Sequence, residues 1–138
     1  MAQALSAFLS AAVRRPFVRG DHDCIMFAAD WARELTGRDP AAAWRAAYAS
    51  RGQASAILAR GGGLEVMVGQ ALEAQGWHRV REPRAGNIGI IVAPTRDEPK
   101  GGRVLGVCAG RHGLWALVTA RGLYIGPAPH VIAWGFCG

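Results

Sequence analysis

The fold of this chain is most constrained by a change in its sequence pattern near Trp77. Before that residue, apolar side chains recur every three or four residues, which is the spacing of amphipathic helices. After it, short apolar runs alternate with glycine- and proline-containing turns, which is the pattern of a β-meander. Helices followed by strands predict an α+β protein, because each apolar helix face has to be buried against another element. We therefore expect N-terminal helices packed on one side of a C-terminal antiparallel sheet.

The helical part is expected to cover about residues 1–76, and the sheet part about residues 86–138. Asp23 and Asp39 stand where N-caps belong, since their carboxylates can accept the free N–H groups of a first helical turn. Gly37 suits a left-handed C-cap. The expected helices span residues 3–14, 24–35, 40–49, 53–60 and 64–75. The expected strands span residues 88–93, 104–109, 114–119, 123–125 and 131–136.

Length and composition fit one domain that spans residues 1–138. Hydrophobic residues make up 51% of the chain, which is enough for a substantial core. No apolar run approaches the roughly 20 residues that cross a bilayer, so we expect no membrane-spanning segment. The first residues lack the basic start and the unbroken apolar stretch of a signal peptide. We therefore expect synthesis in the cytoplasm.

The charge is basic and comes almost entirely from arginine. Lys and Arg number 16 against 10 Asp and Glu, which gives a formal net charge of +6, and Lys100 is the single lysine. Because the arginines are scattered and form no nucleic-acid-binding motif, we expect an acidic partner protein or the cell envelope rather than nucleic acid. The cysteines, Cys24, Cys108 and Cys137, fit neither a disulfide framework nor metal-ligand spacing. Free thiols, and no metal or cofactor, are expected.

Cys24 is the residue that most suggests chemistry. It begins an expected helix, where the free amides and the macrodipole favour a thiolate. Asp21 in the preceding loop and Asp23 at the N-cap surround this thiol. They oppose that effect, because nearby negative charge raises the pKa of a thiol. Two interpretations stay open from the residues alone. Cys24 is either a nucleophile or a small buried apolar side chain at the start of a helix.

Three segments resemble the NlpC-type cell-wall cysteine peptidases, which have a papain-like fold. The segment GDHDC at residues 20–24, followed by an apolar helix, resembles their nucleophile segment. The segment GNIGIIV at residues 86–92 resembles the start of their next strand, with Asn87 in place of aspartate. The segment VLGVCAG at residues 104–110 resembles the strand that follows. The resemblance implies a papain-like α+β fold with Cys24 at the nucleophile position.

The whole chain is closer still to a phage and prophage branch of that superfamily, a family of unknown function. The shared features are TGRDP at residues 36–40, Tyr48 before a glycine-linked helix, a Gly-Leu pair at 122–123 and a closing Ala-Trp pair at 133–134. Genes of that branch tend to lie among the tail genes of phages and gene transfer agents. The resemblance therefore implies a virion component of a tail tip or baseplate, with other tail proteins as partners.

The chain departs from the peptidase pattern where the general base should be. In the active superfamily a strand histidine accepts the thiol proton, and alignment by the glycines puts Val104 at that position. The next strand should supply a polar orienting residue and offers only Thr119. His22, two residues before Cys24, and His130, before the last expected strand, are the histidines that could substitute as the base.

Two functions follow as hypotheses. The favoured one is a phage or gene-transfer-agent tail component that keeps the peptidase fold without its activity and enters the particle after synthesis in the cytoplasm. The alternative is an active cysteine peptidase or amidase that cleaves peptidoglycan peptides during DNA delivery. In that case Cys24 is the nucleophile, helix amides are the oxyanion donors and a substitute histidine is the base.

Overall fold

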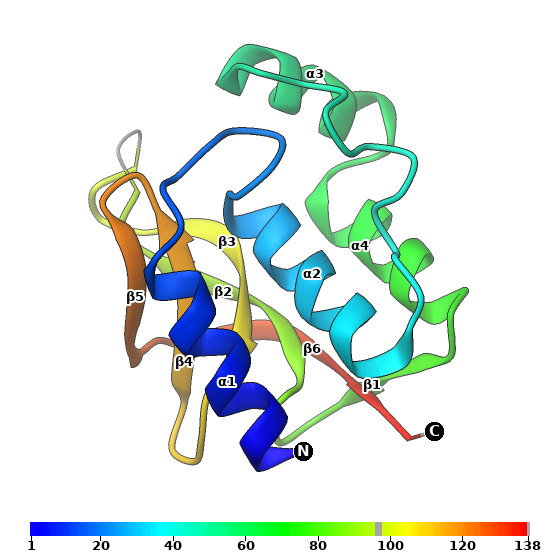
Figure 1. Ribbon diagram of the computed structural model, residues 1–138. Helices are drawn as coiled ribbons and strands as arrows, with labels where there is room; N and C mark the ends of the chain where they lie inside the picture. Colours follow the sequence, from blue (N-terminus) through cyan, green and yellow to red (C-terminus); the bar gives the residue numbers. More distant parts are fainter. Residues whose placement is uncertain (96–97, 138) are drawn as a thin grey trace.

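The structure is a computed structural model that describes residues 1–95 and 98–137, and within these residues four helices precede six strands (Figure 1). The helices are α1 (Ala2–Val13), α2 (Cys24–Thr36), α3 (Arg51–Arg60) and α4 (Leu64–Glu73). The strands are β1 (Trp77–Val80), β2 (Ile88–Ala93), β3 (Gly102–Cys108), β4 (Leu114–Thr119), β5 (Gly122–Pro127) and β6 (His130–Phe136). The expected α+β class, with helices first and strands second, is confirmed.

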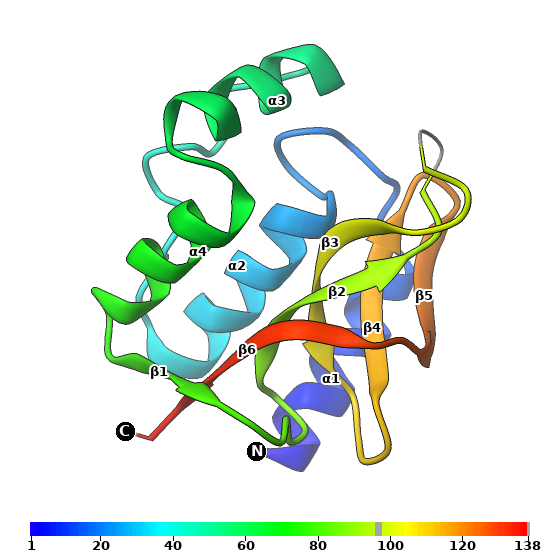
Figure 2. The same ribbon diagram turned by 180° about the vertical axis from the view of Figure 1, so that it is seen from behind.

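The strands form one antiparallel sheet in the order β1-β6-β2-β3-β4-β5. The last strand, β6, returns to lie between β1 and β2, as the view from behind shows (Figure 2). In the β2–β3 hairpin, Ile90 lies opposite Leu105 and Ile91 lies opposite Val104. Because successive side chains of a strand point to opposite faces of the sheet, Val104 and Leu105 belong to different faces.

The main core lies between the sheet and the helices. The central helix, α2, packs on β3 and β4. Its Trp31 is fully buried and donates its indole N–H to the Gly86 carbonyl at 2.7 Å. α1 covers this helix through Phe8, whose ring centroid lies 5.3 Å from the rings of both Phe27 and Trp31. Full burial of such a side chain stabilises the fold by about 1.5–3 kcal/mol, so these aromatic contacts hold α1 on α2.

The opposite face of the sheet carries a second apolar cluster centred on Trp115, which is fully buried. Its ring lies close to two glycines of the central strands. A Cβ atom on Gly89 would lie 2.5 Å from the Trp115 ring, and one on Gly106 would lie 3.0 Å from Ile91 Cδ1. The close approach of Trp115 to the sheet therefore needs glycine at position 89. This outer cluster consists of Ile91, Ala93, Cys108, Trp115, Leu117 and Ala133, with Val80, Val104 and Ala128 packed against it.

The segment 40–49 is not the helix that the sequence predicts, because residues 40–46 form successive turns. Ala46 has a left-handed φ of 57° and donates its N–H to the Gly20 carbonyl at 3.1 Å, which ends any helical pattern there. Arg45 forms ion pairs with the carboxylates of both Asp30 and Asp39. These long-range contacts override a local helical preference that is worth only tenths of a kcal/mol per residue, in the range of about 0–0.7.

The strand β1 is an element that the sequence analysis does not predict. It pairs with β6, and Trp77 lies opposite Phe136. Trp77 is 2% exposed and joins the main core, whereas the two residues after it are exposed. A strand of four residues next to a polar turn offers too short an alternation to be recognised from its pattern.

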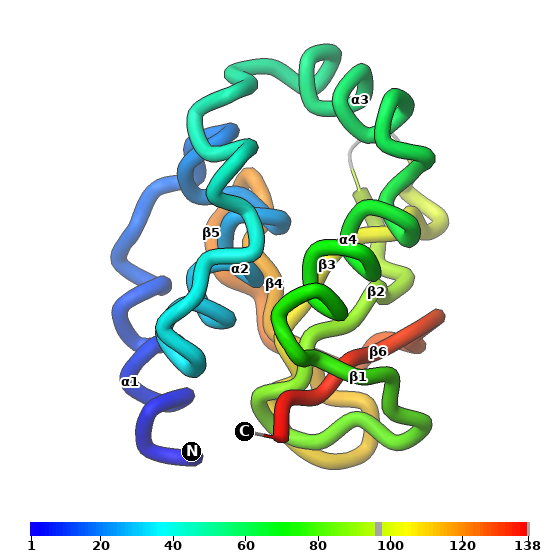
Figure 3. Tube along the Cα trace, turned by 90° about the vertical axis from the view of Figure 1, so that its right-hand side faces the viewer, coloured from blue at the N-terminus to red at the C-terminus, as the bar shows by residue number. Residues whose placement is uncertain are grey.

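α3 and α4 lie on the side of α2 that faces away from α1 (Figure 3). α3 sits above the N-terminal end of α2, and α4 returns from it to β1. The segment 40–49 runs from the end of α2 back along this helix to the start of α3, and its Ala41 and Tyr48 pack against both helices. Among the described residues, no helix combines the length and the apolar character needed to cross a membrane.

Candidate functional site

Cys24 is held at the start of α2 by the carboxylate of Asp23. Asp23 has extended backbone, with φ −131° and ψ −174°, and it is 3% exposed. Its carboxylate accepts hydrogen bonds from Gly20 N–H at 2.8 Å, from Met26 N–H at 2.8 Å and from the Tyr48 hydroxyl at 2.6 Å. The N-cap expected from the sequence is confirmed. With these donors on it, the carboxylate anchors the turn and is not free to orient a catalytic base.

Tyr48 also belongs to this site, and its contact with Asp23 could not be predicted from the sequence. Its backbone oxygen lies against Gly20, where a Cβ atom would approach to 2.1 Å. Gly20 has a φ of +86°, which glycine adopts without strain. Burial, and then the hydrogen bond to Asp23, raise the pKa of Tyr48, so its hydroxyl remains a donor. A buried tyrosine hydroxyl usually forms a hydrogen bond, but the sequence does not show with which residue.

Burial raises the pKa of the Cys24 thiol to about 11, and the negative charge of Asp23 acts in the same direction. The Leu105 amide, the charge of Arg19 and the Ile25 amide lower this pKa but are smaller effects. A thiol with this pKa is ionised in only about one molecule in ten thousand at pH 7. The start of α2 therefore does not produce the activated thiolate that its helix amides alone would favour.

His22 lies beside Phe27 of α2 and close to Arg15, which follows the end of α1. The His22 ring is 2% exposed and meets the Phe27 ring edge-on, with 6.4 Å between the centroids. Burial, and then the charge of Arg15, lower the pKa of His22. Both ring nitrogens are buried and form no hydrogen bond of ordinary geometry within the described ranges, and the Ala12 backbone near the ring has a smaller, opposite effect on the pKa. His22 is therefore a core residue that is not hydrogen-bonded to Cys24.

His130 is exposed at the start of β6 and lies on the face of the sheet that carries the outer cluster. Its ring centroid is 6.3 Å from that of Trp115. Val104, at the position expected for the strand histidine, packs against the same outer cluster. Leu105 belongs instead to the main core on the helix side. The strand position aligned with the base is thus occupied by an apolar side chain on the face away from α2.

Thr119 and Asp21 are engaged elsewhere. Thr119 uses its hydroxyl to close the turn between β4 and β5. Asp21 is exposed and forms an ion pair with Arg15 at 3.5 Å. The part of the chain that the structure describes brings Asp23 and backbone amides to Cys24, but no histidine hydrogen bond and no third polar residue of a catalytic triad.

The cysteines are free thiols: Cys24 is half-buried, Cys108 is buried and Cys137 is exposed. The Cys108 thiol donates to the Gly110 carbonyl at 3.1 Å, and burial raises its pKa. Over residues 1–95 and 98–137, no group of three or more His, Cys, Asp or Glu side chains gathers in a way that could hold a metal ion.

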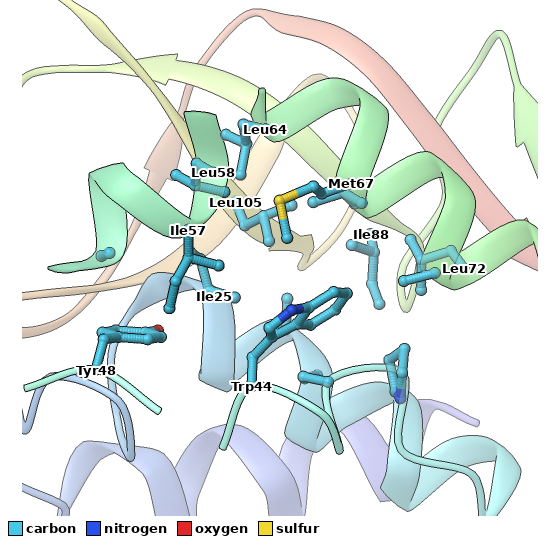
Figure 4. A pocket seen from close by; sticks show the side chains of 17 residues that line it. Ile25, Trp44, Tyr48, Ile57, Leu58, Leu64, Met67, Leu72, Ile88 and Leu105 are labelled. Carbon is cyan, nitrogen blue, oxygen red and sulfur yellow. The ribbon is translucent and has the colours of Figure 1, made fainter. Parts of the chain in front are cut away.

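An apolar cavity of about 60 Å³ lies beside the Cys24 turn, between α2, α3, α4 and the segment 40–49 (Figure 4). Ile25 of α2, Ile88 of β2 and Leu105 of β3 line it, and Trp44 and Tyr48 line it from the segment 40–49. It adjoins an open groove of about 730 Å³. The cavity and the groove share four lining residues, which are Trp44, Ile57, Met67 and Ala71. This cavity could not be predicted from the sequence, because it depends on how the segment 40–49 packs.

The comparisons with known proteins concern nearly the whole chain. A family model described as a domain of unknown function (DUF6950) matches residues 1–135. No curated protein and no solved structure matches the chain.

Proposed function

The chain belongs to the family described as a domain of unknown function (DUF6950), and we propose that it is a structural component of a phage or gene-transfer-agent tail tip or baseplate. In this proposal the domain has a papain-like, NlpC-type fold and does not hydrolyse a substrate. The state of Cys24 carries the proposal: burial raises the pKa of its thiol to about 11, and no described histidine is hydrogen-bonded to it. A nucleophilic cysteine needs an adjacent base or a lowered pKa, and Cys24 has neither.

The NlpC-type assignment is supported by the way Cys24 is placed. It heads an apolar helix after a glycine-containing turn, and that helix packs on β3 of an antiparallel sheet. Segment GDHDC supplies the turn, and segment VLGVCAG supplies most of β3 and the residues after it. Two of the three segments that resemble the peptidases are therefore in contact, as a shared fold requires.

The tail assignment rests on the resemblance of the chain to phage and prophage proteins. It is supported by an exposed edge strand, β5, whose Tyr124 and Ile125 are 48% and 47% exposed. Edge strands with exposed apolar side chains favour pairing with another protein. The net charge of +6 suits an acidic partner. In this proposal the protein is made in the cytoplasm and then bound by other tail proteins.

The alternative function is an active cysteine peptidase or amidase that acts on peptidoglycan peptides. One observation favours it: the amides of Leu105 and Ile25 both act on the Cys24 sulfur and lower the pKa of its thiol, so backbone donors lie near the atom that would attack a carbonyl. Activity would also require a base, and His22 would have to leave its buried place to supply one.

The proposal is tested in purified particles. We expect mass spectrometry to find the protein among tail components, and particles with Cys24→Ser to deliver DNA as efficiently as wild type. Cys137→Ser, which changes an exposed thiol, is the matched control. Loss of delivery with Cys24→Ser alone, together with release of peptides from purified peptidoglycan by the wild-type protein only, would establish the alternative. Absence of the protein from the particles would refute the tail assignment.

A further inference from the structure

The cavity beneath α3 and α4 offers too few polar groups to hold a water molecule. The lining consists of Met67 and of aliphatic and aromatic residues. Its polar side-chain groups are the Tyr48 hydroxyl, which already donates to Asp23, and the Trp44 indole N–H (Figure 4). A buried water needs about two to four polar partners, and empty cavities in proteins are accordingly apolar. The space is therefore suited to an apolar ligand.

The size of the cavity selects the shape of that ligand. An apolar cavity of about 150 Å³ is known to admit benzene. The cavity here is partly open and has a volume of about 60 Å³, which is too small for an aromatic ring. A slender alkyl chain fits better, because its end can occupy the cavity while the rest lies in the adjoining groove of about 730 Å³.

Met67 lines both the cavity and the groove and lies at the passage between them. Its side chain is packed over Gly61, where a Cβ atom would lie 2.2 Å from the Met67 sulfur. Methionine has three rotatable side-chain bonds and adapts readily to a neighbouring ligand. A chain that enters from the groove can thus displace this side chain without moving the backbone of α4.

The polar part of the groove lining lacks negative charge. Arg60 and Gln70 belong to this lining, and neither the cavity nor the groove is lined by a carboxylate. Arg60 is exposed, and within the described ranges it forms no hydrogen bond or ion pair. An unpaired, exposed guanidinium in the lining of a largely apolar groove complements an anionic headgroup.

We propose that this cavity and groove form a binding site for a single-chain amphiphile with an anionic head, such as a free fatty acid. The alkyl chain lies along Trp44, Ile57 and Ala71 and ends near Leu105. The carboxylate lies at Arg60. The site is independent of any chemistry at Cys24 and goes beyond a structural role in a particle.

The first test is a chain-length series of saturated fatty acids, measured by titration calorimetry with the full-length protein below the micellar concentration. Each buried methylene should tighten binding about fourfold, since its transfer from water is worth about 0.8 kcal/mol. The affinity should then level off once the chain fills the site. An affinity that does not change between hexanoate and dodecanoate would overturn the proposal.

The second test uses matched variants. Ala71→Phe adds a ring at a residue that lines both the cavity and the groove, and it should abolish dodecanoate binding. Ala59→Phe is its control, because it makes the same change at an exposed position of α3 outside both linings and should leave dodecanoate binding unchanged. Arg60→Gln should weaken dodecanoate about tenfold and leave dodecanol unchanged, whereas Arg81→Gln removes an exposed charge elsewhere and should alter neither. Circular dichroism establishes that each variant folds.

Other occupants of the groove would give different results. Equal dodecanoate affinity for Ala71→Phe and Ala59→Phe would show that the ligand binds elsewhere and would overturn the proposal. A concentration-dependent dimer that Ala71→Phe dissociates, with no fatty-acid binding, would show that a second copy of the chain occupies the groove. That result would also overturn the proposal.

Discussion

Tyr48→Phe removes one atom from the anchor of the Cys24 turn and leaves the packing of the ring unchanged. The lost hydroxyl donates to Asp23 at 2.6 Å, and the carboxylate it serves is 3% exposed, so water cannot replace the bond. A hydrogen bond to a charged group contributes about 1.5–3 kcal/mol. Because the Gly20 and Met26 amides still bind the carboxylate, we take the middle of this range and expect a loss of about 2 kcal/mol.

The assay is thermal and urea unfolding followed by circular dichroism. For a chain of this length a loss of about 2 kcal/mol corresponds to a decrease in Tm of about 8 °C. Tyr124→Phe is the matched control, because Tyr124 is 48% exposed and its hydroxyl makes no hydrogen bond within the described ranges. Its stability should stay within about 0.5 kcal/mol of wild type. If Tyr48→Phe is no more destabilising than Tyr124→Phe, then Asp23 does not anchor the turn as the structure indicates.

Two further predictions concern His22, next to α2, and Gly89 of β2. Burial lowers the pKa of His22 in the folded protein, so near and below the ordinary histidine pKa of about 6.5 the unfolded chain binds more protons than the folded one. The free energy of unfolding should therefore decrease as the pH falls through about 6.5 and toward the pKa of His22 in the folded protein. Urea unfolding at several pH values checks this, and His22→Phe should reduce the slope; an unchanged slope would exclude His22 as its cause. Gly89→Ala should destabilise the protein by about 1–3 kcal/mol, because the added methyl group collides with Trp115. Gly52→Ala is the control, because a methyl group there meets nothing within 4 Å, and the stability of this variant should equal or exceed that of wild type. Equal losses of stability in the two variants would contradict the close packing of Trp115 on Gly89.

Features fixed by neighbouring residues could be predicted from the sequence. Asp23 caps α2 through Met26, three residues later, and Gly37 ends the same helix with a left-handed φ of 78°. Both predictions are confirmed because capping depends on atoms within one helical turn. The division into helices followed by an antiparallel sheet is confirmed for the same reason, since each periodicity is local.

Features fixed by distant residues could not be predicted. Residues 40–46 have a helical pattern but form turns, because Ala46 binds Gly20 and Tyr48 binds Asp23 across the chain. The position of Cys24 at the start of a helix was also visible in the sequence. Whether Cys24 is a nucleophile or a buried thiol could not be decided from the sequence, because its burial depends on how α2 packs on β3, and burial is the largest cause of the raised thiol pKa.

Cys24 lacks an activated thiolate, and its reactivity with iodoacetamide as a function of pH distinguishes an ordinary buried thiol from one that is paired with a base. The measurement uses Cys137→Ser to remove the exposed thiol, and a second Cys24→Ser change identifies the signal. We predict slow labelling that is still increasing at about pH 10, as expected for a thiol whose pKa is about 11. Rapid labelling with a midpoint below about pH 7 that disappears with His22→Gln would show a paired thiolate and contradict the claim.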